Sequence, residues 1–147
     1  MAEPLNRLRL ELPGLADNVG VVRVAVAAFA AQGGFTLGDL DEIKVAVSEA
    51  ATNVVLHAYA DGPGPLSVWA ELHPDRLVVR VRDNGRGIED VQRARRPAFS
   101  TLSGHMGLGF VVMESFMDEV HVISRPGSGT SVEMVRRRSP SPAGQPS

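Results

Sequence analysis

The sequence predicts an α+β fold, a two-layer sandwich in which a mixed, largely antiparallel sheet carries helices on one face. Three observations support this prediction. Segments that alternate between apolar and polar residues come in neighbouring pairs separated by short turns, as antiparallel strands do. Three longer stretches have helical periodicity, which is enough to cover one face of a sheet. The chain of 147 residues, 44% hydrophobic and 22% charged, is long enough to bury one core.

The first two expected elements are a strand at residues 7–13 and a helix over about 17–32. In the strand, three leucines alternate with charged residues, which indicates one buried and one exposed face. The helix is apolar over most of its circumference, and Arg23 is its only basic residue. Two interpretations remain open for this helix. It is either an alanine-rich internal helix, or it has two buried faces, one on the core and one on a partner.

The second expected helix runs from a Thr-Leu-Gly-Asp capping box at 36–39 to about residue 59. Its core stripe consists of apolar residues at helical spacing, namely Ile43, Val47, Ala50 and Val54. Glu49, Asn53 and His57 recur at intervals of four beside this stripe, so a carboxylate, an amide and an imidazole stack along one edge. The ladder is either a partly exposed polar face or part of a site in which Glu49 accepts a proton and Asn53 binds Mg²⁺. His57 is interpreted as structural, because no second histidine or carboxylate is spaced to join it as a metal ligand.

Two strands, residues 66–72 and 76–83, are expected to form an antiparallel pair. Asp83 ends the inward-facing apolar row of the second strand, directly before Asn-Gly-Arg-Gly at 84–87. A carboxylate in that position requires hydrogen-bond donors. It either accepts a bond from the exocyclic amine of a bound ring, or it belongs to an ordinary Asp-Asn-Gly turn.

A glycine- and arginine-rich connection leads to the last expected elements, a helix and two strands at residues 109–120, 119–124 and 130–137. Gly107 and Gly109 are expected to open this helix, and a helix N-terminus with uncluttered N–H groups binds phosphate well. The sequence contains neither a Walker phosphate loop nor a Rossmann glycine fingerprint after a strand. A phosphate site here would therefore belong to another fold.

Composition excludes several functional classes. The formal net charge of −2 argues against direct nucleic-acid binding, which requires a basic surface. The absence of cysteine excludes disulfides and thiolate metal sites. No apolar run approaches the ~20 residues of a membrane span, so we expect a soluble cytoplasmic protein. We expect one domain over residues 1–137 and a disordered, Pro/Ser-rich tail over 138–147.

Four short motifs in a fixed order are more specific than any one of them. "EAATN" on a helix, "DNGRG" after a strand, "GLG" at a helix and "GT" before the last strand resemble the nucleotide boxes of the GHKL (Bergerat) ATP-binding superfamily. "GDLDEIKVAVSEAATNVVLHAY", "RRPAFST" and "GLGFVVMESFMDEV" narrow the match. Over roughly residues 8–137 the chain resembles the anti-sigma-factor serine-protein kinases of bacterial partner-switching systems, and their sporulation anti-sigma F branch most of all.

This resemblance implies roles for individual residues. Glu49 would be the catalytic base, Asn53 would hold Mg²⁺, and Asp83 would recognise the adenine amino group. Arg23 would contact both a sigma factor and an anti-anti-sigma protein. The adenine pocket would be shaped by Gly85 and Gly87 and supported by Thr130. The phosphates would face Gly107 and Gly109.

The resemblance also implies a function. The protein would be a homodimeric anti-sigma factor that binds a sigma factor and uses Mg²⁺ and ATP to phosphorylate a serine of an anti-anti-sigma protein. Residues 88–106 would form a lid over the triphosphate. The relatives carry an arginine before the glycine box, and His105 stands nearest to that position here, where a neutral imidazole would stabilise phosphate charge less than a guanidinium does. The alternatives are a general-stress anti-sigma kinase, an ATP-gated binding module without kinase activity, and a detached histidine-kinase ATPase domain.

Overall fold

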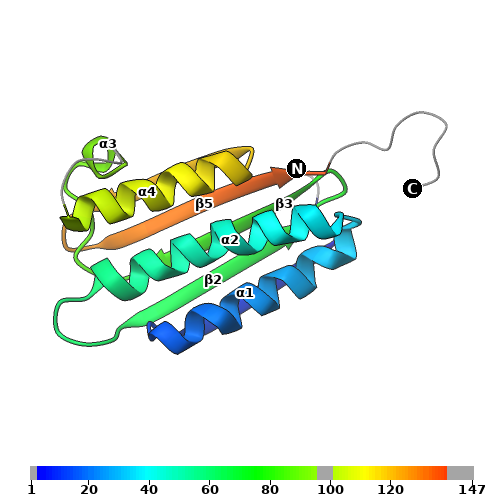
Figure 1. The fold of residues 1–147 in the computed structure, drawn as a ribbon. Helices are drawn as coiled ribbons and strands as arrows, with labels where there is room; N and C mark the ends of the chain where they lie inside the picture. The colour runs from blue at the N-terminus through cyan, green and yellow to red at the C-terminus, as the bar shows by residue number, and fades with distance from the viewer. Residues whose placement is uncertain (1–2, 96–100, 139–147) are drawn as a thin grey trace.

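The computed structural model describes residues 3–95 and 101–138, and the side chains of 93, 94 and 101–105 lie outside that description. Within it, one five-stranded sheet is covered on one face by helices (Figure 1). The predicted α+β sandwich is therefore confirmed. All pairings among the described strands are antiparallel. The prediction of a mixed sheet is therefore wrong for these strands, and the prediction of a largely antiparallel one is confirmed.

The strands, in the spatial order β1-β2-β3-β5-β4, are β1 (Asn6–Pro13), β2 (Pro65–Leu72), β3 (Arg76–Asp83), β5 (Gly129–Arg137) and β4 (Glu119–Arg125). The helices are α1 (Ala16–Ala30), α2 (Leu37–Asn53), α3 (Val91–Ala94) and α4 (Thr101–Phe116). Two short helical turns prolong α1 and α2, namely the 3₁₀ turn η1 (Ala31–Gly33) and the π turn η2 (Val54–Ala58). Each strand and long helix predicted from the sequence is thus present, with shifted ends.

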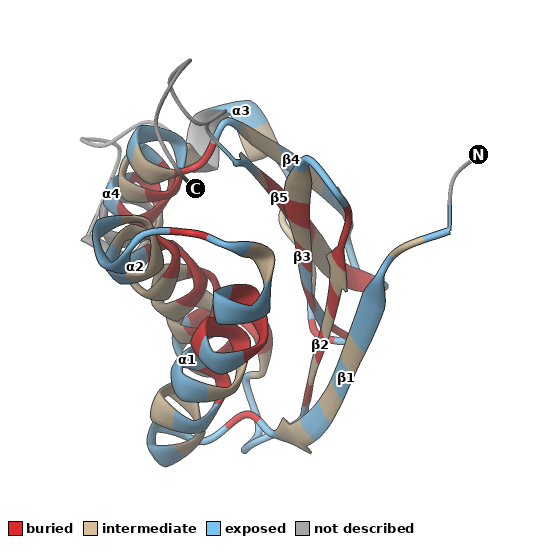
Figure 2. Ribbon diagram, turned by 90° about the vertical axis from the view of Figure 1, so that its right-hand side faces the viewer, coloured by how far each residue is buried: buried red, intermediate tan, exposed pale blue. Residues whose placement is uncertain are grey.

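The core lies between the helices and the inner face of the sheet (Figure 2). Alternate residues of β2 and β3 are buried there, as the period-two pattern predicted. The largest fully buried side chains are Phe110, Ile43, Leu66, Leu77, Met113 and Met134. The predicted stripe of the second helix is also buried, and α2 packs against both α1 and α4.

The N-terminus of α2 forms the predicted capping box. The Thr36 hydroxyl accepts a bond from the Asp39 N–H at 3.0 Å, and the Asp39 carboxylate accepts one from the Thr36 N–H at 3.0 Å. Arg136 at the end of β5 donates to the same carboxylate at 2.7 Å. These bonds lower the pKa of Asp39 against the opposing effect of its burial. The start of α2 is therefore fixed to the sheet.

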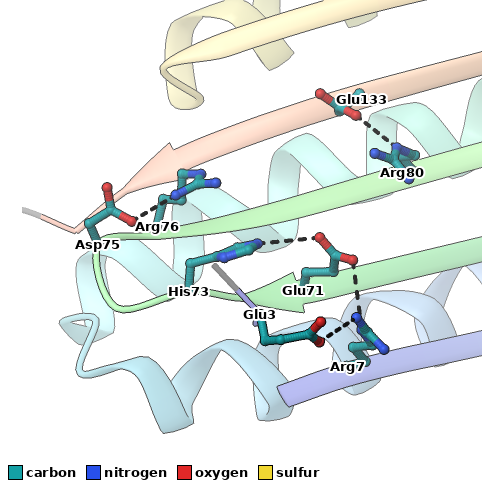
Figure 3. A network of polar contacts seen from close by, with 8 residues as sticks. All are labelled: Glu3, Arg7, Glu71, His73, Asp75, Arg76, Arg80 and Glu133. Carbon is teal, nitrogen blue, oxygen red and sulfur yellow. Dashed lines mark hydrogen bonds and ion pairs between the residues drawn. The ribbon is translucent and has the colours of Figure 1, made fainter. Parts of the chain in front are cut away.

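The outer face of the sheet is charged and faces solvent. Figure 3 shows its contacts: Arg7 lies between Glu3 and Glu71, His73 contacts Glu71, and Arg80 pairs with Glu133 at 2.7 Å. Exposed pairs of this kind contribute little to stability. They place charged side chains on the uncovered face of the sheet, whereas the core lies on the other face.

Candidate functional site

A cavity of about 510 Å³ opens between α2 with η2, α4, and the ends of β3 and β5. Its volume is in the range of small-molecule sites. The cavity has an apolar wall that includes Val81, Val132, Met106 and Phe110. The polar lining residues include Asn53, His57, Asp83, Arg86 and Thr130. Apolar walls with a few polar groups are suited to a flat ring carrying a polar substituent.

Asp83 is a buried carboxylate of this cavity, with 6% of its surface exposed. Its Oδ1 accepts hydrogen bonds from the N–H groups of Gly85 at 2.9 Å and Thr130 at 3.2 Å. Burial raises the pKa of Asp83, and the two backbone donors only partly oppose that effect. Both of these bonds reach Oδ1, so Oδ2 is the oxygen that could accept a bond from a ligand amine.

The glycines after Asp83 are required by close backbone approaches. A Cβ on Gly85 would lie 2.1 Å from the carbonyl oxygen of Ala58, and one on Gly87 would lie 2.1 Å from that of Arg125. Gly87 also has a φ of +75°, which side chains rarely allow. Gly87 lines the cavity, whereas Gly85 does not. Gly85 therefore shapes the pocket through packing, and Gly87 also forms part of its surface.

Hydroxyl groups fix the segments around Asp83. The Tyr59 hydroxyl donates to the Pro65 carbonyl at 2.5 Å and accepts from the Asn84 N–H at 2.9 Å. The Ser124 hydroxyl accepts from the Ile88 N–H at 2.7 Å and is bonded to the Thr130 hydroxyl at 2.7 Å. Neither Tyr59 nor Ser124 stands out in the sequence, because their roles depend on contacts between distant segments.

Asn53 has a buried amide that lines the cavity. Neither its oxygen nor its nitrogen has a hydrogen-bond partner in the described part of the chain. A buried unpaired polar group is costly and requires an explanation. An amide oxygen is a suitable ligand for a hard cation such as Mg²⁺, so the residue present fits the predicted metal role.

Glu49 lies one helical turn before Asn53, outside the cavity lining. Gly109 on α4 faces both residues. A Cβ on it would lie 3.1 Å from Glu49 Oε2 and 3.6 Å from Asn53 Oδ1. Gly109 therefore leaves space between α4 and the two polar groups, a function that the glycine pattern alone did not predict.

The prediction that Gly107 and Gly109 open a helix is wrong. α4 begins at Thr101, so both glycines lie inside it. The physical reason is that residues 101–109 contain no proline to stop a helix, while packing of α4 against α2 offsets the cost of their three glycines, about 1 kcal/mol each. Gly107 is buried and does not line the cavity. In this conformation neither glycine presents a helix N-terminus to a phosphate.

Two cavity residues were not assigned to the site from the sequence. His57, interpreted as structural, is 6% exposed and lines the cavity. Arg86, in the "DNGRG" motif, lines it as well. The π turn η2 carries His57, and π turns are frequent at functional sites. Such a turn has no sequence signature, whereas the arginine inside a recognised motif was a signal that could have been used.

Arg23 lies apart from the cavity, on an exposed part of α1. Its guanidinium is 3.5 Å from the Ser48 hydroxyl of α2. Two apolar neighbours, Val21 and Val24, are 48% and 65% exposed. The helix therefore has one face on the core and a second apolar face that no described residue covers fully.

The predicted lid, residues 88–106, is described only in part. Residues 96–100 and the side chain of His105 lie outside the described residues. Arg95 holds the first part of this segment against α4, because its guanidinium pairs with Glu114 and lies 5.4 Å from the ring centre of Phe110. The described lid is thereby connected to a residue of the cavity wall.

Comparison with known proteins identifies the family. Residues 12–136 match the family model described as a histidine kinase-like ATPase domain. Over 143 residues the chain is 43% identical to the anti-sigma F factor of Anoxybacillus flavithermus, covering 94% of this chain and 97% of the relative. The chain belongs to the anti-sigma F factor family of histidine kinase-like ATPases. The anti-sigma F factor of Bacillus subtilis is 38% identical, with 94% and 97% of the two chains covered.

Two solved structures share the fold of this anti-sigma F family member. The RsbU and RsbW domains of Rv1364c from Mycobacterium tuberculosis match with a TM-score of 0.67 and 23% identity, over 91% of this chain and 32% of that one. A blue-light activated histidine kinase of Erythrobacter litoralis matches with a TM-score of 0.57 and 24% identity, over 85% and 42%. These similarities confirm the GHKL-type fold. No helix among the described residues is long and apolar enough to cross a membrane.

Proposed function

We propose that this anti-sigma F family protein binds ATP with Mg²⁺, holds a sigma factor inactive, and phosphorylates a serine of a small anti-anti-sigma protein. One observation supports this most strongly. The Asp83 carboxylate and the unpaired Asn53 amide line the same cavity, with Glu49 one turn away. The relatives named anti-sigma F factors match over almost their whole length.

The Asp83 end of the cavity suits an adenine ring. Oδ2 of Asp83 would accept a bond from the exocyclic amine, while Val81 and Val132 would contact the ring faces. Thr130 keeps the carboxylate in place through its backbone N–H and reaches the loop after β3 through Ser124. This arrangement selects a base with an amine donor, because a carbonyl at that position would oppose a carboxylate oxygen.

The Asn53 end suits the phosphates. Asn53 Oδ1 would be the protein ligand of Mg²⁺, which when bound would neutralise charge on the phosphate oxygens. The amide is held by α2, whose packing between α1 and α4 limits its movement. Gly109 leaves the space beside it open. The conformation described buries the amide, so we expect α4 to move away from α2 when nucleotide binds.

Phosphoryl transfer would depend on Glu49. The serine oxygen of the partner attacks the γ-phosphorus while the bond to the bridging oxygen of ADP breaks, and the serine proton passes to the Glu49 carboxylate. ADP leaves with the bridging oxygen. Positioning of the hydroxyl and electrostatic stabilisation of the phosphate account for most of the rate in reactions of this class.

The exposed face of α1 suits the protein partners. Arg23 stands there among exposed valines, which provides a charge beside an apolar surface. Both the sigma factor and the anti-anti-sigma protein would use this surface, so that the two compete. A protein with these partners and with ATP as substrate would act in the cytoplasm.

The free edge of β1 suits a homodimer. β1 is an edge strand that pairs only with β2 among the described strands. If two copies pair antiparallel with Leu10 opposite Leu10, each Arg9 faces a Glu11 of the other copy. Centring the pairing on Arg9 or on Glu11 instead opposes like charges. One register is thus favoured by charge, and it would extend the sheet across both copies.

The decisive experiment incubates the protein with radiolabelled ATP, Mg²⁺ and the cognate anti-anti-sigma protein. We expect phosphoserine with the wild type and with Asp41→Ala, a control in which an exposed acid of α2 is removed. Glu49→Ala should abolish transfer while retaining ATP binding. No phosphoserine with the wild type would refute the kinase proposal.

A second candidate is ATP-gated sigma binding without kinase activity. One observation favours it, since Glu49 is not among the residues that line the cavity. The same assay separates the two candidates, because a binding module would bind ATP and the sigma factor but would transfer no phosphate to the anti-anti-sigma protein. A competition experiment would decide the type of sigma factor: a sporulation sigma factor and a general-stress sigma factor would compete for binding to the purified protein.

A further inference from the structure

Arg86 is fixed at the rim of the cavity by three hydrogen bonds. Its backbone N–H donates to the Ala58 carbonyl at 2.8 Å, and its side-chain Nε–H donates to the His57 carbonyl at 2.8 Å. Its own carbonyl accepts from the Gly127 N–H at 2.7 Å. The residue therefore connects the turn after β3 to the last carbonyls of η2 and to the turn between β4 and β5.

These bonds leave the end of the guanidinium available. Its two terminal nitrogens have no hydrogen bond or ion pair with any residue in the described ranges, while Arg86 itself lines the cavity. Because the Nε–H bond holds the side chain against η2, the terminal N–H groups are oriented before a ligand arrives. A pre-oriented fork loses less entropy on binding.

The charge balance of the cavity makes this group important. Arg86 is the only arginine or lysine among the described residues that line it, and the carboxylates of Asp83 and Glu89 line it as well. A nucleoside triphosphate carries about four negative charges at neutral pH, and bringing it next to these carboxylates is unfavourable without cations. A guanidinium is well suited to phosphate oxygens, since it donates two parallel bonds.

We propose that Arg86 is a further nucleotide-binding residue, whose terminal N–H groups donate to phosphate oxygens of the bound nucleotide. The inference rests on the proposed ATP site and adds a phosphate contact from the "DNGRG" motif, whose family resemblance implies contacts only at the adenine end. Arg86 thereby links recognition of the base to recognition of the phosphates, because the same turn carries the N–H donor to Asp83.

A purely structural role is the competing explanation. Arginine near a helix C-terminus stabilises unpaired carbonyls, and the bond to the His57 carbonyl does this for η2. Such a role predicts that removing the side chain weakens binding of every ligand of the cavity in proportion to local disorder. A phosphate contact predicts a loss restricted to ligands that carry phosphate.

Calorimetric titration of ATP and of adenosine into the wild type, Arg86→Gln and Arg86→Lys separates these explanations. For Arg86→Gln we expect ATP to bind roughly tenfold to a hundredfold more weakly, and adenosine to bind as in the wild type. Arg86→Lys, which keeps the charge, should recover most of the ATP affinity. An equal loss for ATP and adenosine, or unchanged ATP affinity, would overturn the inference.

Arg82→Gln is the matched control. Arg82 is also an exposed arginine, but it lies on the outer face of β3, away from the cavity. Its replacement removes the same net charge and should leave the ATP affinity unchanged, so an equal loss in both variants would refute a local contact. A wild type that fails to bind ATP would overturn the proposed function together with this inference. If the wild type and Arg86→Gln bind ATP equally tightly, the inference about Arg86 is overturned while the proposed function stands.

Discussion

Thr130 and Asp83 are joined across β5 and β3, because the N–H of Thr130 donates to Oδ1 of Asp83 at 3.2 Å. The N–H of Gly85 reaches the same oxygen at 2.9 Å. One oxygen thus receives both structural bonds, and the other remains for a ligand. This division separates the contribution of Asp83 to the fold from its contribution to binding.

Replacing Asp83 by asparagine should therefore weaken nucleotide binding without unfolding the protein. The amide oxygen can keep both backbone bonds, whereas the amide nitrogen would oppose the adenine amine with a second donor. We expect ATP affinity to fall at least about tenfold in calorimetry, with an unchanged circular dichroism spectrum. Retained affinity in a folded variant would contradict the assignment of the adenine contact.

The same variant should change how stability depends on pH. Burial holds the pKa of Asp83 above 3.8, so the folded protein binds the proton more tightly than the unfolded chain. The contribution to the free energy of unfolding is therefore fully present below pH 3.8 and is lost as the pH rises through the folded pKa. The side chain introduced by Asp83→Asn does not ionise. The free energy of unfolding, measured with urea across this pH window, should therefore fall less with rising pH in the variant than in the wild type.

Asn53→Ala should stabilise the ligand-free protein while removing its response to Mg·ATP. The two unpaired amide atoms of Asn53 are buried, and their removal relieves a cost of roughly 1 kcal/mol or more. Urea unfolding with and without Mg·ATP measures both effects. The wild type should gain stability from the ligand, and the variant should not. A variant that is less stable without ligand, or equally stabilised by it, would refute the role of Asn53.

The regular elements could be predicted because they depend on local patterns, whereas the residues of the candidate site were assigned only through the resemblance of four motifs to a family. Alternation in β2 and β3 and the capping box at Thr36 determine these elements nearly by themselves. The start of α4 and the π turn could not be predicted, since each depends on packing between distant segments rather than on a stop signal. The same limit applies to Gly85, where the requirement for glycine comes from the Ala58 carbonyl of another element.

Gly109→Ala should reduce phosphoryl transfer more than ATP binding. The new Cβ would lie 3.1 Å from Glu49 Oε2, so it would displace the carboxylate, while alanine is the better helix former by about 1 kcal/mol. We expect a lower kcat with little loss of thermal stability. Gly38→Ala, in the first turn of α2 and with its nearest atom at 3.7 Å, is the control that should keep full activity. Unchanged kcat in Gly109→Ala would show that this space is not needed.

Arg23→Glu should weaken both partner complexes and leave nucleotide affinity unchanged. Arg23 is exposed on α1, apart from the residues that line the cavity. A charge reversal in the centre of an interface usually costs at least tenfold in affinity. Pull-down of the sigma factor and of the anti-anti-sigma protein tests the first part, and ATP titration tests the second. Arg82→Glu, on the outer face of the sheet, should retain both partners, and intact complexes with Arg23→Glu would contradict the proposed surface.

A charge exchange on β1 should test the proposed dimer. Glu11→Arg would oppose Arg9 of the other copy with a second arginine, so sedimentation equilibrium should show a dimer that dissociates more readily than the wild type. Adding Arg9→Glu to the same chain restores opposite charges in the register centred on Leu10, and the double variant should associate again. Recovery in the double variant is the diagnostic result, because general damage to the strand would make the second substitution additive rather than compensating. A wild type that is monomeric, or a double variant weaker than either single one, would refute pairing through this edge.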